Sequence, residues 1–331
     1  MVGSPFEHLP IDPMPALLAH EGRALNYFLQ RDILNEAVPP VDQLWELPEP
    51  QKLVRRQQSD GSWRYTGQNR TRFPETNYDL LQTFKGLASL IQKSGFDRRH
   101  PAIAQAADYL FSCQTEEGDF RGILGTQYMP YYHGLLVELL VAAGYADDPR
   151  THRALEWLLA VRQQDGGWIV PLQAVPAREQ TRELWSAQPL APDRSLPSSH
   201  LATGMALRAV VTHPAYRHRE ETRRAAALLQ SRLLQPDRYG ARKASSYWTK
   251  FQYPFWWTNL VTALDSLSLL GFSADETQIR DSLDWFATHQ EDNGLWRTGY
   301  EQAKRAQPSL KEVDTMAWVG LAVCRILKRF A

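Results

Sequence analysis

The sequence has no excess of either charge. Its 37 Lys and Arg residues balance its 37 Asp and Glu residues, so the formal net charge at pH 7 is zero. The chain therefore lacks the positive field with which a nucleic-acid-binding surface attracts phosphates. We expect no nucleic acid among its partners.

Cysteines and long apolar runs are also scarce. Cys113 and Cys324 each lie within an apolar pattern of helical period, which predicts buried free thiols rather than a disulfide or a metal pair. No stretch approaches the roughly 20 apolar residues of a membrane span, and no signal-like segment opens the chain. We therefore expect a soluble, cytoplasmic protein without a transmembrane segment, whose contact with a membrane would be peripheral.

What the sequence does contain is a short motif that recurs. Glutamine opens the motif, glycine lies in its turn, and an aromatic residue closes its clear copies. The aromatic residues follow one another at intervals of 48 to 71 residues, and self-similarity at such a period indicates a repeat architecture. The copies are Gln57–Trp63, Gln114–Phe120, Gln163–Trp168, the degenerate Gln235–Gly240 with Tyr239 as its aromatic residue, and Gln290–Trp296.

Two kinds of helical segment alternate between the copies. Segments such as 131–144 are apolar nearly all round, which predicts a helix buried on all sides. Segments such as 149–163 carry one apolar stripe and a charged face, which predicts a surface helix. About six such pairs, counting N-terminal helices that pair with the last one, predict an all-α fold. We expect a single (α/α)6 toroid at 20–331, preceded by an irregular arm at 1–19.

The motif lies where an outer helix ends and the chain returns toward the next inner helix. Its glycine can take the left-handed conformation that ends a helix, and its glutamine can bond loose backbone groups. We therefore interpret the motif as a structural joint, and we expect the functional residues to lie between its copies.

These repeats resemble the QW-type repeats of the squalene/hopene cyclase and protein-prenyltransferase superfamily, over roughly residues 50–330. The resemblance implies one α/α toroid with its site in a central cavity, at the end where the inner helices begin. It implies no single activity, because one fold hosts many chemistries.

Protein prenyltransferases of this superfamily hold a catalytic zinc with an Asp-x-Cys pair before a Tyr-x-Phe-Trp helix start, and with a later His. Residues 253–256, Tyr-Pro-Phe-Trp, resemble that helix start. The Asp and Cys positions fall on Lys250 and Gln252, and the His position falls near Asp314, so the zinc ligands are missing. We expect neither a metal site nor zinc-dependent prenylation; Mg²⁺ would enter only with a diphosphate substrate.

Class II cyclases use an Asp-x-Asp-Asp-Thr-Ala stretch whose middle Asp protonates an alkene or epoxide. Residues 312–317, Glu-Val-Asp-Thr-Met-Ala, are similar but lack one of the adjacent acids. The resemblance implies that Asp314 is the proton donor, tuned by Glu312 or His133, with aromatic faces that stabilise cations. Capping of the last helix by Glu312 and Asp314 is the alternative interpretation.

The predicted inner helices all begin with polar and aromatic residues, and a closed barrel would bring these starts to one mouth. A Pro-rich segment at 169–197 is the longest interruption of the repeats, and such a segment is commonly a lid or unstructured. The catalytic candidates are Asp314, Glu312, His133 and Asp79, and the substrate-binding candidates are Tyr78, Tyr131, Tyr132, His200, Trp256, Trp257 and Trp318.

The leading hypothesis is a terpene-cyclase-like or prenyl-binding enzyme that protonates a hydrophobic isoprenoid in an aromatic cavity. A carbohydrate-active α/α-barrel enzyme, a glycosidase or lyase, is the second hypothesis: Asp79 with Asp314, or a Tyr–His pair, would supply its acid–base chemistry. The third is a non-catalytic binding module whose cavity is filled by side chains.

Overall fold

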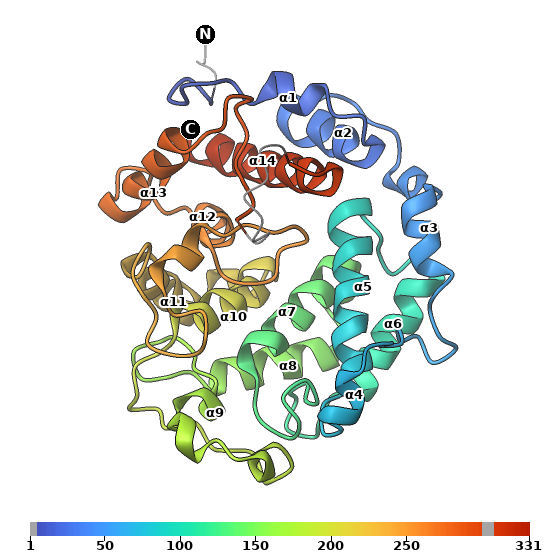
Figure 1. The fold of residues 1–331 in the computed structure, drawn as a ribbon, viewed down its shortest axis with the longest axis vertical. Coiled ribbons are helices and arrows are strands. Elements are labelled where there is room, and N and C mark those ends of the chain that lie inside the picture. The colour runs from blue at the N-terminus through green and yellow to red at the C-terminus, as the bar shows by residue number, and fades with distance from the viewer. Residues whose placement is uncertain (1–4, 300–307) are drawn as a thin grey trace. The chain divides into compact units, whose positions relative to one another are not determined.

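The computed structural model describes residues 5–299 and 308–331, and these residues form helices and isolated β-bridges without a strand. The prediction of an all-α fold is therefore confirmed (Figure 1). In chain order the helices are α1 (Met14–Leu18), α2 (Arg23–Leu29), α3 (Pro48–Val54), α4 (Asn69–Arg72), α5 (Tyr78–Ser94), α6 (Pro101–Ser112), α7 (Pro130–Leu140), α8 (Pro149–Ala160), α9 (Pro171–Ala174), α10 (His200–Thr212), α11 (Glu220–Ser231), α12 (Leu260–Leu269), α13 (Thr277–Thr288) and α14 (Leu310–Phe330). Short 3-10 or π turns lie at Gln30–Leu34, Val41–Leu44, Val141–Tyr145, Ala177–Glu179, Arg182–Trp185, Tyr216–His218 and Ser245–Thr249.

The chain divides into two compact units. Unit 1 comprises Met1–Pro40, Gln230–Pro236 and Lys243–Ala331, and unit 2 comprises Val41–Leu229 and Asp237–Arg242. The single toroid over 20–331 stays a prediction.

In unit 2 the inner helices α7 and α10 run parallel in close contact. A Cβ on Gly134 of α7 would lie 2.6 Å from the Cα of Ala206 of α10, so only glycine permits this approach. Farther along both helices, Arg208 of α10 pairs with Glu138 of α7 at 2.9 Å. Because both contacts advance in the same direction, the two helices begin at the same end.

Two further contacts show that helix α5 also runs parallel to α7. The ring of Phe84 meets that of Tyr132 near the start of α7, with centroids 6.2 Å apart. Beyond the end of α5, Arg98 donates its backbone N–H to the carbonyl of Ala143, beyond the end of α7. The starts of α5, α7 and α10 therefore lie at one end of unit 2.

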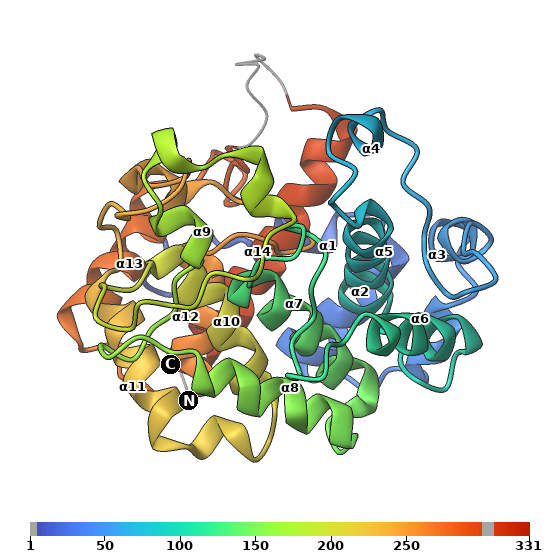
Figure 2. The same cartoon turned by 90° about the horizontal axis from the view of Figure 1, so that it is seen from below.

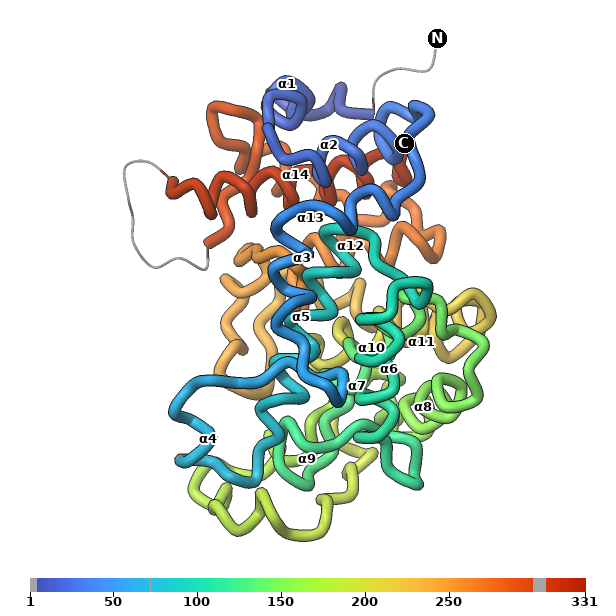
Figure 3. The backbone as a smooth tube through the Cα atoms, turned by 90° about the vertical axis from the view of Figure 1, so that its right-hand side faces the viewer, coloured from blue at the N-terminus to red at the C-terminus, as the bar shows by residue number. Residues whose placement is uncertain are grey.

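Unit 1 pairs the beginning of the chain with its end (Figures 1 and 3). Helix α1 lies against α14 near Leu17 and Gly320, and the ring of Phe28 in α2 lies 6.1 Å from that of Trp318 in α14. The expected pairing of the N-terminal helices with the last helix is confirmed. The prediction of an irregular arm at 1–19 is wrong at α1, where residues after Pro13 form a short helix that buries Leu17.

The recurring motif forms joints, as interpreted from the sequence. In the second copy, Gln114 donates to the carbonyl of Gly118 in its own turn and to that of Arg150 in the first turn of α8, at 2.8 and 2.9 Å. Gly118 has a φ of +107°, a conformation that favours glycine. The glutamine thus ties the end of one outer helix to the start of the next.

The fourth copy closes with a different aromatic residue from the one expected. Trp248, which is buried, donates its indole N–H to the carbonyl of Gln235 at 2.7 Å. In the third copy Trp168 likewise donates to Leu158. Tyr239, predicted as the closing aromatic, has a buried hydroxyl without a hydrogen-bond partner in the described part of the chain.

Candidate functional site

His133 connects two parts of the repeat architecture of unit 2. Its Nδ1 accepts the backbone N–H of Phe120 at 3.1 Å, so its Nε2 carries the proton and donates to the carbonyl of Ala154 at 2.9 Å. The ring is fully buried, and burial lowers its pKa to about 4. A neutral imidazole with both nitrogens bonded to backbone has no position left for a substrate.

Threonines occupy the equivalent place in two other copies. Thr83 accepts the N–H of Trp63 at 2.9 Å, and Thr203 accepts that of Trp168 at 3.0 Å. In each case a side chain of the next inner helix fixes the closing aromatic residue. We therefore assign His133 a structural role in the joints. Its contacts do not favour a role in catalysis or in the tuning of Asp314.

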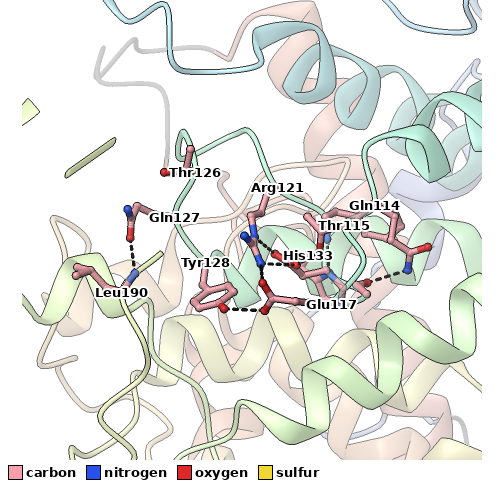
Figure 4. A network of polar contacts seen from close by, with 12 residues as sticks. Gln114, Thr115, Glu117, Arg121, Thr126, Gln127, Tyr128, His133 and Leu190 are labelled. Atoms are coloured by element: carbon pink, nitrogen blue, oxygen red, sulfur yellow. Dashed lines mark hydrogen bonds and ion pairs between the residues drawn. The ribbon is translucent and has the colours of Figure 1, made fainter. Parts of the chain in front are cut away.

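The charged residues beside His133 are also paired with one another (Figure 4). Arg121 donates to the buried carboxylate of Asp119 at 2.8 Å and pairs with Glu117. Glu117 accepts the hydroxyl proton of Tyr128 at 2.7 Å. This network holds the second copy and the segment before α7 together.

Asp79 also holds a neighbouring segment in place. One oxygen accepts the backbone N–H of Tyr65 at 2.7 Å, and the other pairs with Arg70. The ring of Tyr78 stacks on that of Tyr65 with centroids 4.7 Å apart. Because both oxygens of Asp79 accept bonds, the contacts do not favour the acid–base role that the carbohydrate hypothesis requires.

His200, at the start of α10, faces an acid that the sequence analysis missed. Its Nε2 lies 3.7 Å from Oδ2 of Asp237, and both groups are buried. The same oxygen accepts the hydroxyl of Ser199 at 2.7 Å and the N–H of Leu201 at 2.9 Å, so Asp237 caps the positive end of α10. Asp237 lies inside the degenerate fourth copy of the motif, and this position is the sequence feature that could have identified it.

Tyr131 and Tyr132 form a buried aromatic pair at the start of α7. Their ring centroids are 4.6 Å apart, and both side chains are almost inaccessible to solvent. Burial raises the pKa of Tyr131 well above its usual range. Tyr131 is therefore a neutral aromatic group.

Asp314 lies in the second turn of α14 and faces His20. Nε2 of His20 is 3.7 Å from Oδ1 of Asp314, an electrostatic contact longer than a hydrogen bond. Nδ1 of His20 accepts the N–H of Gly22 at 3.0 Å, so Nε2 carries the ring proton that faces the carboxylate. The side chain of His20 is 14% exposed and that of Asp314 is 39% exposed. The acid thus lies at the edge of solvent.

Glu312 does not share this face of the helix. Residues two apart on a helix point in different directions. The cap of α14 is Ser309, whose hydroxyl accepts the N–H of Glu312 at 3.3 Å. Ser309 is therefore the N-cap, whereas Glu312 lies in the first turn, where its negative charge favours the positive helix end, as the capping alternative holds. Tuning of Asp314 by Glu312 stays a prediction, and the group beside Asp314 is His20.

Aromatic rings continue from Asp314 along α14. Trp318, one turn further and 4% exposed, stacks on Tyr253 with centroids 4.9 Å apart and an interplanar angle of 4°. Trp256 and Trp257 stack on each other at 5.3 Å and are half-buried. Unit 1 thus holds an acid and several π faces.

The predicted site residues are distributed over both units. Their convergence on one mouth stays a prediction. Unit 2 holds Tyr78, Asp79, Tyr131, Tyr132, His133 and His200, and unit 1 holds Trp256, Trp257, Glu312, Asp314 and Trp318.

The long segment 169–197 is folded against its own unit (Figure 2). It carries α9 and two 3-10 turns. The buried amide of Gln127 donates to the carbonyl of Leu184 at 2.5 Å and accepts the N–H of Leu190 at 2.9 Å (Figure 4). These bonds hold the segment in place; a lid function stays a prediction.

In residues 5–299 and 308–331, no group of three or more His, Cys, Asp or Glu side chains could hold a metal ion. No helix in this part of the chain is both long and apolar enough to cross a membrane.

Comparison with known proteins finds a family resemblance for residues 82–183. They match the family model of the squalene-hopene cyclase C-terminal domain. Over 86 residues the chain is 33% identical to a probable squalene–hopene cyclase of Sinorhizobium fredii. This aligned stretch covers 26% of this chain and 13% of that protein. Over 80 residues it is 32% identical to the squalene–hopene cyclase of Zymomonas mobilis, and this stretch covers 24% of this chain and 12% of that protein. The predicted resemblance to this superfamily is therefore confirmed for this segment.

Solved structures give a weaker likeness. A protein from Actinoplanes aligns with a TM-score of 0.45 and 16% identity, over 96% of this chain and 99% of that one. A variant of the type II terpene cyclase MstE from Scytonema, in complex with geranylgeranyl dihydroxybenzoate, aligns with a TM-score of 0.45 and 12% identity, over 88% and 98% of the two chains. At these scores the likeness establishes neither fold nor activity.

Proposed function

We propose that this protein is a class II-type terpene cyclase that protonates an isoprenoid from Asp314. The observation that carries the proposal is the contact of Asp314 with His20, one helical turn from the stacked rings of Trp318 and Tyr253. The match of residues 82–183 to squalene-hopene cyclases supports the class of reaction. Asp314 lies outside that segment, so its role rests on its surroundings and on the motif at 312–317.

In this proposal His20 positions the proton of the acid. Its Nε2–H faces Oδ1 of Asp314 and would orient the carboxyl group that gives its proton to the substrate. The proton adds to a terminal alkene, whose π electrons form the new C–H bond and leave a carbocation on the neighbouring carbon. Further double bonds attack this cation, and loss of a proton ends the isomerisation. The faces of Trp318 and Tyr253 would stabilise the cation.

The test is product formation from squalene and from linear prenyl diphosphates supplied with Mg²⁺, analysed by mass spectrometry. Asp314→Asn removes the proton, and we expect it to lower the rate about 10³-fold. Glu312→Gln is the matched control and should stay within about threefold, because Glu312 lies on another side of the helix. His20→Ala should lower the rate by roughly one to two orders of magnitude. Absence of any product, or an Asp314→Asn variant as active as wild type, would contradict the proposal.

A further inference from the structure

A pocket of about 560 Å³ opens beside the first copy of the motif in unit 2. It is bounded by the end of α3, by the segment 63–67 and by α5. Figure 3 shows the course of the chain from α3 to α5. The volume falls within the roughly 300–1,000 Å³ typical of small-molecule sites.

Both charged residues that line this pocket are arginines. Arg56 follows α3, and Arg64 follows the closing Trp63. Within residues 5–299 and 308–331, neither guanidinium pairs with a carboxylate, whereas nearby Arg70 pairs with Asp79. Two guanidinium groups without counter-charges favour an oxyanion, which they can bind through several N–H groups at once.

Neutral polar groups complete the lining. Gln58 and Gln82 contribute amides, and the amide of Gln82 on α5 has no hydrogen-bond partner among the described residues. Tyr65 forms a fixed wall, because its N–H is bonded to Asp79 and its ring is stacked on Tyr78. The contacts of Asp79 and Tyr78 therefore hold this pocket in shape.

We propose that this pocket binds a small polyanion whose oxyanion groups are phosphates or carboxylates. Arg56 and Arg64 would neutralise two negative charges, and Gln58 and Gln82 would bond the remaining oxygens. The pocket is polar and open, so it suits a charged group better than an isoprenoid chain. The proposal is independent of the chemistry proposed for Asp314.

Isothermal titration calorimetry of the full chain tests this site, with inorganic pyrophosphate as the phosphate probe and citrate as the carboxylate probe. We expect saturable binding of at least one probe at a single site. Arg56→Gln and Arg64→Gln should each weaken it about tenfold. Gln82→Leu, which leaves the charge unchanged, should weaken it about threefold. Tighter binding of pyrophosphate would identify a phosphate site, and tighter binding of citrate a carboxylate site.

Arg55→Gln is the matched control, because Arg55 adjoins Arg56 on the surface but does not line the pocket. It should change affinity less than twofold. Circular dichroism should show that each variant is folded. The proposal is overturned if neither probe binds at millimolar concentration, or if Arg55→Gln weakens binding as much as Arg56→Gln does.

Discussion

The helix starts of unit 2 and the start of α14 in unit 1 carry similar residues but use them differently. In unit 2, Asp79 and His133 bond the segments that return from the first and second joints. In unit 1, Ser309 caps α14, and Asp314 faces the ring of His20. A polar residue at a helix start is thus a weak indicator of catalysis until its hydrogen bonds are known.

The largest expected difference separates the two aspartates. Asp314→Asn should lower the rate of product formation about 10³-fold, whereas Asp79→Asn should leave the rate of the folded enzyme within about threefold of wild type. Asp79→Asn should instead lower the free energy of unfolding by roughly 1–2 kcal/mol, because the pair with Arg70 is lost and the bond to Tyr65 weakens. Product assays and urea unfolding measure both effects. If Asp79→Asn is inactive but as stable as wild type, Asp79 is catalytic, and the proposed difference between Asp79 and Asp314 is wrong.

The pH dependence of stability sharpens the contrast at His133. Its pKa is about 4 in the folded protein against an ordinary 6.5, so the unfolded chain binds more protons between these values. The contribution of neutral His133 to the free energy of unfolding is fully present above about pH 6.5. It is lost as the pH falls toward 4, by up to roughly 3 kcal/mol. His133→Thr keeps an acceptor for Phe120, as in the two threonine copies, but cannot titrate.

We therefore expect the stability of wild type relative to His133→Thr to fall through this window, as measured by urea unfolding at several pH values. Comparison with the variant removes the contribution of other titrating groups. A constant difference between pH 7 and pH 4 would show that His133 is not held neutral. Loss of activity in a stable His133→Thr protein would return His133 to the catalytic candidates.

The fold was predictable because its signals are local. Helical period, burial on one or all sides, and the recurring motif are each contained in short stretches, and they gave the all-α fold and the joints. The equivalence of His133 with Thr83 and Thr203 was hidden, because these residues follow their closing aromatics by 13, 20 and 35 residues. Loops of different length remove any common spacing.

The contacts of the candidate site depend on packing between distant segments. No pattern around His20 marks it, and it meets Asp314 only because α1 packs against α14. Asp314 itself was predictable, since the stretch 312–317 resembles a known motif. The sequence therefore indicated the acid but not the group beside it.

The smallest expected effect concerns Gln127, a buried polar residue near the start of α7 that again serves structure. Its amide makes hydrogen bonds to Leu184, Gln188 and Leu190, so Gln127→Ala removes three bonds that hold the segment 169–197 to the stretch before α7. We expect a loss of about 2 kcal/mol, confined to the segment 169–197. Limited trypsin digestion should then cleave this segment at least tenfold faster, while the remaining chain stays protected.

Gln180→Ala is the matched control, because Gln180 lies in the same segment but is exposed, and its side chain bonds within that segment, to the carbonyl of Val175. Its digestion rate should stay within about twofold of wild type. If Gln127→Ala is cleaved no faster than this control, Gln127 does not hold the segment. If it is cleaved faster and also forms product faster, the segment limits access to the site, and unit 2 takes part in turnover through its loop rather than through its helix starts.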